Sequence, residues 1–503
     1  MGMGALKKII AEVKGEAGAL YELLILYFYA LSTASPNPRD ILKMASTPSA
    51  PIRDLSQIFR KVSEAVERWG YELNKALRYV LNKIRDRDVQ SFLKRLSDSM
   101  TLSLDIREFM RVELERMMAS LVDEFERRLD RVKKMIDAYS AILTSTAFLS
   151  VSMLLIASIY GINVNNLLLS TAIGIFIILT LMSLLIAHSL PPDPVLHEEG
   201  HCPEKLKLLK KASVLGIPAS IAISVTLLTI FGAESDPIKA MSLPLLVSGV
   251  PLLVVGRIGL RWVNKSREID RNLPSFMKSL GDAVEVSGSV KSACKLILMN
   301  DYGPMNKLLK KLKKRLEMGF SQRLALQTFG RETISKLSYS MSSIMADALH
   351  YGARGSIVGK AIHDYSLRKL ENRKKRMQAA GMLWGIALPL QAAFSAISAL
   401  ISVLMKTMAA FINLTSSWLP LFAPIPEPYI HTFFLSITFA TAYASAFSFY
   451  RIRGDSSFSF TYALGFLLAV SGAVYAFASM VSQSILRMAM NLTEEITSLL
   501  GEL

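Results

Sequence analysis

Seven long apolar stretches, each free of Asp, Glu, Lys and Arg, constrain this chain of 503 residues more than any other feature. About 20 consecutive apolar residues suffice to cross a bilayer as a helix. The soluble arrangement of several domains that the length alone would suggest is therefore excluded. We predict a polytopic membrane protein with about seven transmembrane helices, at residues 139–160, 166–187, 212–232, 241–256, 380–405, 430–450 and 458–480.

The predicted spans contain almost no ionisable side chains that could form an ion pathway. His431, at one end of its span, is the only histidine or charged side chain in the seven stretches. Ion-coupled transporters and proton pumps usually place ionisable groups at membrane depth, so a channel or transporter is disfavoured. The frequent Ser, Thr, Gly and Ala residues favour close helix–helix packing, and such surfaces would permit a homodimer.

Positive charge is distributed very unevenly along the chain. Of 58 Lys and Arg residues, 55 lie in residues 1–138, 188–211, 257–378 and 451–457. Because Lys and Arg accumulate on the cytoplasmic side of membrane proteins, we expect these segments and the N-terminus in the cytoplasm. The net charge of +17 then belongs to a cytoplasmic face and does not require a nucleic-acid partner.

The two large polar regions show helical periodicity and no alternating strand pattern, so we predict an all-α fold. Each region is expected to form a cytoplasmic helical domain that runs into membrane helices. The expected order is a first domain (1–138), four spans with a cytoplasmic loop (139–256, loop 188–211), a second domain (257–378), three spans (379–480) and an extracytoplasmic C-terminal tail (481–503).

The apolar segment 17–34 follows three lysines and mimics a signal peptide. Glu22 lies inside the apolar run, and nearby tyrosines make the segment amphipathic. We therefore favour a helix of the first cytoplasmic domain. A membrane segment or signal anchor is the alternative.

An internal repeat relates the two polar regions. VERWGYELNKAL (66–77) aligns with RLEMGFSQRLAL (315–326) at an offset of 249 residues, which places Gly70 on Gly319. Upstream, STASPNPRDILKMA (32–45) parallels VEVSGSVKSACKLI (284–297). Each copy ends in a long basic helix that leads into the membrane. The shared order of these features predicts a duplication.

Several segments carry a family resemblance. In the second copy they are IDRNLPSFMKSLGDAVEVSGSVKSACKL (269–296), EMGFSQRLALQTF (317–329) and HYGARGSIVGKAI (350–362), and in the first copy YFYALSTASPNPRDILKMA (27–45). They resemble the type II secretion system F-domain superfamily. More closely, they are similar to the archaeal platform proteins of archaella and type IV pili, the FlaJ-like family. The resemblance covers nearly the whole chain.

The resemblance implies a membrane platform for filament assembly. A cytoplasmic hexameric ATPase is expected to dock on the cytoplasmic domains and to drive the movement of pilin-like subunits from the bilayer. The first copy departs from the pattern, since TLSLDIR (101–107) lacks the turn glycines, and we expect its last turn to differ. Asp270 and Pro274 are expected to set the entry of a helix. The family's turn positions fall on Asp270, Pro274, Gly288, Gly319, Gly352 and Gly355.

The sequence offers no nucleotide-binding loop of its own. GSIVGKA (355–361) has too few residues between its glycines for a P-loop, and Ala361 stands where Ser or Thr would bind magnesium. We therefore predict that the chain is not an enzyme, has no cofactor and depends on a partner for energy.

One alternative function comes from His197-Glu198-Glu199-Gly200-His201, which matches H-E-x-x-H. On a helix this spacing would let His197 and His201 bind zinc while Glu198 acts as general base, as in a membrane metalloprotease. The preceding PPDPV (191–195), the glycine and the lack of a clear third ligand favour a polar cytoplasmic loop instead.

Basic residues are dense in the second polar region. They could form a surface that binds the acidic face of an ATPase, or a solvated face beside anionic lipid headgroups. The surface comprises Lys307, Lys310, Lys311, Lys313, Lys314, Arg315, Arg373, Lys374, Lys375 and Arg376. Two sequons, at Asn413 and Asn491, lie outside in this topology and are candidate N-glycosylation sites.

Overall fold

The computed structural model describes residues 17–35, 37–47, 52–81, 84, 86–160, 164–197, 203–231, 238–415 and 425–501. In these ranges the regular structure is helical, apart from one isolated bridge between Leu196 and Ser335. The predicted all-α fold is confirmed. The chain divides into two compact units. Unit 1 comprises Met1–Arg127, Pro191–Cys202 and Trp262–Lys374, and unit 2 comprises Arg128–Leu190, Pro203–Arg261 and Lys375–Leu503.

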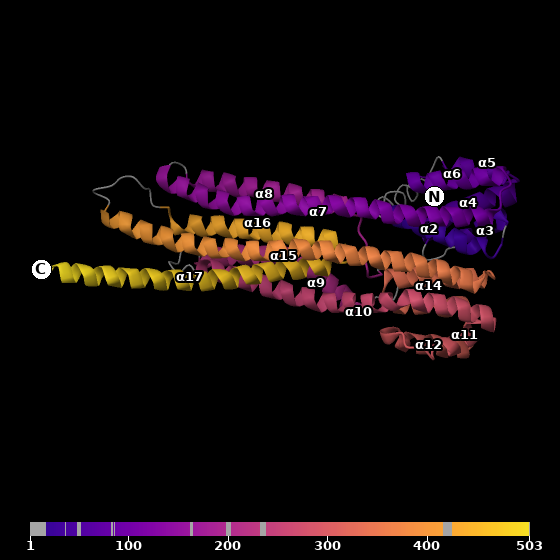
Figure 1. Cartoon of the computed structure of the whole chain (residues 1–503). Helices are drawn as coiled ribbons and strands as arrows, with labels where there is room; N and C mark the ends of the chain where they lie inside the picture. Colours follow the sequence, from indigo (N-terminus) through magenta and orange to yellow (C-terminus); the bar gives the residue numbers. More distant parts are fainter. Residues whose placement is uncertain are drawn as a thin grey trace. The chain divides into compact units, whose positions relative to one another are not determined.

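Seven helices of the described chain are long and apolar enough to cross a membrane, and we conclude that the chain is a polytopic membrane protein, as predicted. Three of them, α7, α10 and α15, continue from unit 2 into unit 1. A short π-helix, η3 (Ile238–Ser242), precedes α10. The seven helices (Figure 1) are α7 (Ile106–Tyr160), α8 (Val164–Ser189), α9 (Glu204–Phe231), α10 (Leu243–Ser287), α15 (Gly355–Thr415), α16 (Glu427–Arg453) and α17 (Ser457–Gly501).

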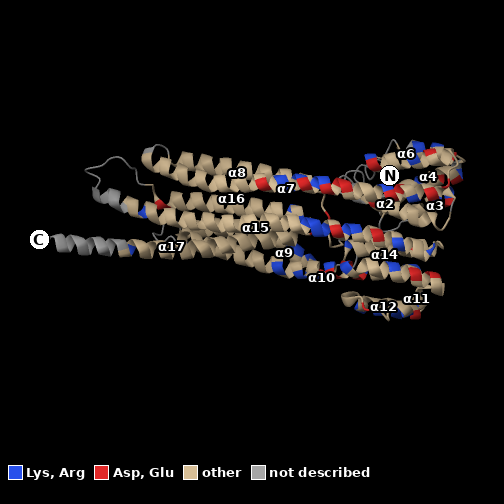
Figure 2. Cartoon of the chain, viewed as in Figure 1, with Lys and Arg blue, Asp and Glu red and all other residues tan. Residues whose placement is uncertain are grey.

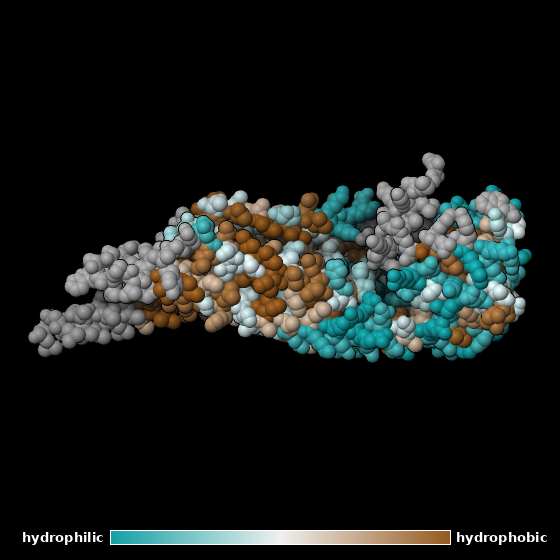
Figure 3. All heavy atoms as spheres, turned by 90° about the horizontal axis from the view of Figure 1, so that it is seen from above, coloured by the Kyte–Doolittle hydropathy of each residue, from teal (hydrophilic) through white to brown (hydrophobic). Residues whose placement is uncertain are grey.

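The helices of unit 2 differ in how much of their apolar surface they bury. Helix α16 packs against α8 and α17, and 67% of its most apolar 18-residue stretch is buried. In α9 only 11% of the corresponding stretch is buried. Apolar side chains dominate the surface of unit 2 in Figure 3, and hydrophilic ones dominate unit 1. Because lipid tails solvate such a surface, an exposed apolar helix is stable in a bilayer.

Small and polar residues hold the bundle of unit 2 together. A Cβ on Gly249 of α10 would lie 2.8 Å from the backbone nitrogen of Ala469 in α17, so glycine lets these helices approach closely. Gln391 of α15 donates hydrogen bonds to the carbonyl of Thr438 in α16 (3.2 Å) and to the hydroxyl of Ser471 in α17 (3.1 Å). One buried amide therefore links three helices.

Unit 1 consists of two helical sets. The first set comprises α2 (Ala17–Ser32), α3 (Pro38–Ser46), α4 (Arg53–Trp69), α5 (Leu73–Leu81), α6 (Arg87–Thr101) and the start of α7. The second set comprises the end of α10, α11 (Val290–Ile297), the 3-10 turn η4 (Gly303–Met305), α12 (Asn306–Glu317), α13 (Gln322–Glu332), α14 (Lys336–His350) and the start of α15. The two sets contribute to one hydrophobic core.

Helix α2 lies in the segment 17–34, for which the sequence allowed either a helix of the first domain or a membrane segment. Leu24, Ile25, Leu26 and Tyr27 are fully buried in the core of unit 1, and Leu31 is as well. A helix that is apolar on every side is expected at the centre of a packed domain as well as in a membrane. The structure therefore places α2 in the domain, as favoured from the sequence.

The two sets agree closely in spacing. Helices α13, α14 and α15 each begin 249 residues after α5, α6 and α7. Gly70 (φ 66°) and Gly319 (φ 86°) end corresponding helices in the left-handed conformation, which glycine adopts without steric cost. A duplication would produce this agreement in position and backbone conformation.

The last turn of the first set was expected to differ, and that expectation is wrong. Ser103 adopts φ 54°, in the place of Gly352 with φ 81°. The amide of Leu104 donates to the carbonyl of Ser99 (3.1 Å), as the amide of Ala353 donates to that of Ala348 (2.9 Å). The surrounding helix ends impose the turn even though serine pays a steric penalty in this conformation.

Candidate functional site

Helix α12 carries most of the predicted basic surface. Leu309, Leu312 and Leu316 are buried along one side of this helix, so the opposite side faces solvent. Figure 2 shows charged residues concentrated on the helices of unit 1 and sparse along those of unit 2. The exposed lysines of α12 are Lys307, Lys310, Lys311 and Lys314.

Neighbouring carboxylates neutralise part of this surface. Arg315 forms a two-bond ion pair with Glu332, whose carboxylate also lies 4.0 Å from Lys311. Lys313 pairs with Glu317 at 3.7 Å. Within the described chain, no carboxylate lies within ion-pair distance of the remaining three lysines. We call Lys307, Lys310 and Lys314 the α12 cationic face.

The first set has no equivalent of this face. Helix α4 corresponds to α12, but its Arg60 pairs with Glu64 (3.7 Å) and its Glu67 pairs with Lys43 of α3 (3.0 Å). Acidic and basic side chains therefore alternate on α4. Among the described residues of the two helices, three exposed lysines on one side occur on α12 and not on α4.

Two arginines of the predicted surface lie inside the protein, and their assignment to it was wrong. The side chain of Arg373 is 13% exposed and binds Asp193 (2.7 and 3.1 Å) and Asp270 (2.9 Å). Arg376 is buried and donates to the carbonyls of Ile452 (2.9 Å) and Arg451 (3.3 Å). It thereby satisfies the unpaired carbonyls at the end of α16. Lys374 is exposed, and Lys375 is half-buried.

Asp270 is the centre of a buried polar network in unit 1. It accepts hydrogen bonds from the hydroxyls of Ser335 and Ser338 (2.7 Å for Ser338) and from Arg373. Burial raises the pKa of Asp270, while Arg373 and the two hydroxyls oppose that rise. Burial alone would lower the pKa of Arg373, but the carboxylates of Asp193 and Asp270 raise it. The network joins α10, α14, α15 and the segment around Asp193.

The segment that contains Asp193 is also held by its backbone. The amide of Lys336 donates to Val195 (2.9 Å), and the amide of His197 donates to Ile334 (2.9 Å). Because these bonds and the Arg373 pair act on the same short segment, the chain that leads away from α8 is fixed against the second set.

The predicted turn positions fall into two groups. Asp270 and Pro274 lie in the interior of α10, so the expectation that they set a helix entry was wrong. The misassignment arose because proline is a weak guide to helix ends in long membrane-linked helices. Gly288, Gly319 and Gly352 have positive φ after helix ends, whereas Gly355 begins α15 and packs against Gly281 of α10.

Asp347 is a buried carboxylate that the sequence analysis did not identify. It is fully buried in α14 and accepts hydrogen bonds from Arg323 (2.7 Å), Gln327 (3.4 Å) and the hydroxyl of Tyr27 (3.3 Å). Its position as the one charged residue in the largely small and apolar stretch from Leu337 to Leu349 was the available signal. Tyr27 belongs to the first set, so this group joins the two sets.

Glu22 makes a second connection between the sets. It binds Lys369 (2.6 Å) and accepts a hydrogen bond from the hydroxyl of Tyr365 (2.8 Å), both in α15. Burial and the nearby carboxylate of Glu22 raise the pKa of Tyr365. The charge that made 17–34 unusual for a membrane span is therefore paired within unit 1.

The H-E-x-x-H alternative gains no support. The ring of His197 packs at a tilt against that of Tyr339, with centroids 4.1 Å apart, whereas Glu198 and His201 lie outside the described residues. In the part of the chain that is described, no group of three His, Cys, Asp or Glu side chains could hold a metal ion. The sequon positions Asn413 and Asn491 lie in α15 and α17, but their side chains are not among those described.

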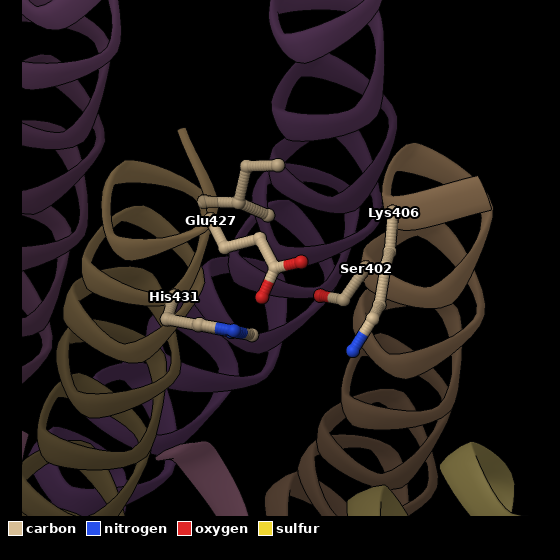
Figure 4. A pocket seen from close by; sticks show the side chains of 5 residues that line it. Ser402, Lys406, Glu427 and His431 are labelled. Carbon is tan, nitrogen blue, oxygen red and sulfur yellow. The ribbon is translucent and has the colours of Figure 1, made fainter. Parts of the chain in front are cut away.

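A small polar pocket lies in unit 2, where α15 and α16 meet (Figure 4). Ser402 and Lys406 of α15 face Glu427, Ile430 and His431 of α16. Of these five residues, only His431 could be singled out from the sequence, because Lys406 and Glu427 lie just beyond the ends of the uncharged stretches. Long-range helix pairing brings them together.

Comparisons with known proteins place the chain among archaeal relatives. It is 24% identical over 382 residues to "Flagella accessory protein J" of Methanocaldococcus jannaschii. The aligned region covers 74% of this chain and 68% of that protein. It is also 24% identical over 397 residues to "Flagella accessory protein J" of Methanococcus voltae, covering 76% and 71%. No family model matches, and no solved structure matches. The predicted resemblance is thus confirmed: the chain is similar to the archaeal proteins named Flagella accessory protein J.

Proposed function

We propose that this protein is the membrane platform of an archaellum or related type IV pilus-like filament. The relatives are named as flagella accessory proteins, and the chain combines a seven-helix membrane bundle with a polar helical unit. Such a protein has a conformational and scaffolding role and catalyses no reaction. The purified chain should hydrolyse neither nucleotides nor peptides.

The α12 cationic face is the observation that carries the coupling part of this proposal. Elsewhere in unit 1 many charges are paired, as at Glu22, Asp270 and Asp347. Lys307, Lys310 and Lys314 remain exposed on one helix side, and Met318 and Phe320 are exposed directly after it. Positive charge beside apolar side chains suits a protein partner with an acidic surface. We assign this surface to a cytoplasmic hexameric secretion ATPase.

The path from the ATPase to the membrane follows from helix continuity. Helices α7, α10 and α15 each include residues of both units without a break. A displacement of unit 1 by the ATPase would pass along these helices to unit 2, where pilin-like subunits would be released from the bilayer. The positive-inside distribution supports a cytoplasmic N-terminus and an extracytoplasmic C-terminus.

Charge reversal on α12 tests the docking surface. The variant Lys307→Glu/Lys310→Glu/Lys314→Glu should lose co-purification with a co-expressed hexameric secretion ATPase, since three attractive contacts would become repulsive. The matched control is Lys61→Glu/Lys75→Glu/Lys94→Glu, which changes the net charge equally at three exposed lysines of the first set. The control should retain binding.

A parallel measurement distinguishes the ATPase from lipid. Flotation with vesicles that contain about 30% phosphatidylglycerol-type anionic lipid measures binding to anionic headgroups. Loss of vesicle binding with unchanged ATPase binding would favour the lipid interpretation. Unchanged ATPase binding in the α12 variant would contradict the proposed docking surface in either case.

A further inference from the structure

Corresponding helices of the two sets differ in what covers them. In the second set, every residue of α14 from Leu337 to Ala348 is buried. In the first set, α6 buries one side only, and Ser91 and Lys94 on its other side are exposed. Because α6 and α14 occupy equivalent places 249 residues apart, the exposed side of α6 corresponds to a covered side of α14.

The first set itself covers that side of α14. Helix α2 contacts α14, and its Tyr27 hydroxyl lies 3.3 Å from the carboxylate of Asp347. At the end of α14, the hydroxyl of Tyr351 lies 3.1 Å from that of Thr47, the residue that ends α3. The cover of the second set is therefore α2 with the end of α3.

The equivalent position on the first set exposes apolar side chains. Leu102 and Leu104 flank the turn after α6 and are 70% and 51% exposed. Their counterparts in the second set are Tyr351, which contacts Thr47, and Ala353, which is buried. Exposed apolar residues at such a turn are typical of an interaction surface.

The second set has a surface equivalent to α2 and the end of α3, and that surface is exposed. Helices α10 and α11 correspond to α2 and α3, and α11 begins 252 residues after α3. Met299 thus occupies the place of Thr47, and it is 82% exposed. Val286 at the end of α10 and Leu296 in α11 are exposed beside it in the sequence.

We propose that a second copy of this chain covers the first set. The end of α10 and α11 in one copy would contact the α6–α7 turn of the other, as α2 and α3 contact α14 within one chain. Each copy has one open surface of each kind, so two copies make two equal contacts, as a two-fold symmetric dimer requires. Continuity with the contact inside unit 1 favours a second copy over an unrelated partner. This inference is independent of the proposed ATPase docking.

Cysteine cross-linking in membranes tests the contact. Two differently tagged full-length chains are co-expressed, one with Leu102→Cys and one with Met299→Cys, both with Cys202→Ser. Oxidation should yield a disulfide-linked species that carries both tags, since a disulfide requires Cβ atoms about 4 Å apart. Replacing Leu102→Cys by Tyr71→Cys, at another exposed turn of the first set, should give none. Absence of the linked species, or equal yield with Tyr71→Cys, would overturn the proposal.

Charge substitution gives a second, non-covalent test. Leu102→Glu/Leu104→Glu should raise the dimer dissociation constant of the full-length protein at least about tenfold, measured by light scattering in detergent. Met299→Lys in the same chain should restore part of the affinity, and Tyr71→Glu should change nothing. A monomeric parent protein, or a dimer that tolerates the two glutamates, would overturn the proposal. Loss of ATPase binding without loss of the dimer would assign the surface to that partner instead.

Discussion

The two helical sets of unit 1 share spacing and turns but use polar residues differently. Asp98 of α6 and Asp347 of α14 are equivalent, being 249 residues apart. The side chain of Asp98 is 48% exposed and pairs with Arg78 at 3.4 Å, whereas that of Asp347 is fully buried among three donors. The equivalent carboxylates therefore differ in role: Asp98 is a surface charge, whereas Asp347 binds residues of both sets. Tertiary surroundings, and not local sequence, decide its role.

The reverse difference occurs deeper in the sets. Arg95 and Glu113 form a two-bond ion pair (2.8 and 2.7 Å) in the first set, in which Glu113 is buried and Arg95 is half-buried. Their equivalents in the second set are Ile344 and Ile362, both fully buried. An apolar pair and an ion pair therefore fill the same place in one backbone framework. This exchange is expected where the pair is well hydrogen-bonded, because its net contribution is then close to that of an apolar contact.

Removal of the two equivalent carboxylates should have the largest and most unequal effects on stability. Asp347→Ala leaves Arg323 and Tyr27 without their shared acceptor and should cost about 3–5 kcal/mol. Asp98→Ala, at an exposed pair, should cost less than about 1 kcal/mol. Thermal unfolding of the full-length protein in detergent, followed by near-ultraviolet circular dichroism at one fixed protein concentration, measures both. Equal losses would contradict the difference in burial.

Replacement of the Arg95–Glu113 ion pair by the two isoleucines of the second set should have a smaller effect. Arg95→Ile alone should cost about 2 kcal/mol, less than a typical broken buried pair, because Arg116 still binds Glu113 at 3.0 Å. The double variant Arg95→Ile/Glu113→Ile should lie within about 1 kcal/mol of the parent. The same unfolding assay applies. A double variant less stable than Arg95→Ile would show that the first set requires the charges.

Exchange of the turn residues should have smaller effects of opposite sign. Ser103→Gly removes the steric penalty of a positive φ and should stabilise the protein by about 1 kcal/mol. Gly352→Ser introduces that penalty and should cost about 1–2 kcal/mol. A Cβ at Gly352 has no neighbour within 4 Å, so the backbone alone determines the result. The same sign for both substitutions would contradict the equivalence of the turns.

The smallest expected effect concerns Cys294 of α11, whose counterpart in α3 is the buried Leu42. Burial raises the pKa of the Cys294 thiol to about 12, so it should react very slowly with iodoacetamide at pH 8 and rapidly after unfolding. Because the unfolded thiol ionises near pH 8.5 and the folded one does not, its contribution to stability should fall as pH rises above about 8.5. Rapid alkylation of the folded chain would show that α11 is not packed as described.

The elements that local sequence determines were predicted well. Uncharged stretches of about 20 residues located the spans, and Gly70 and Gly319 revealed the repeat offset. The buried networks were missed, because Asp270, Arg373 and Asp347 meet partners that are distant in the chain. Arg373 and Arg376 were assigned to a surface since a run of basic residues on a helix does not reveal which of them face neighbouring helices. Ser103 was missed because a serine gives no local signal for a left-handed turn.

Thiol labelling in intact cells tests the central claim most directly, namely that both helical sets lie on the cytoplasmic side of the membrane. Single cysteines replace Lys61 and Lys310, which are exposed on α4 and α12, in a chain that carries Cys202→Ser and Cys294→Ser, and a membrane-impermeant maleimide is applied from outside. Both positions should be protected in intact cells and labelled after lysis, while Thr493→Cys in the C-terminal tail should be labelled in intact cells. Labelling of Lys61→Cys or Lys310→Cys from outside would contradict the account.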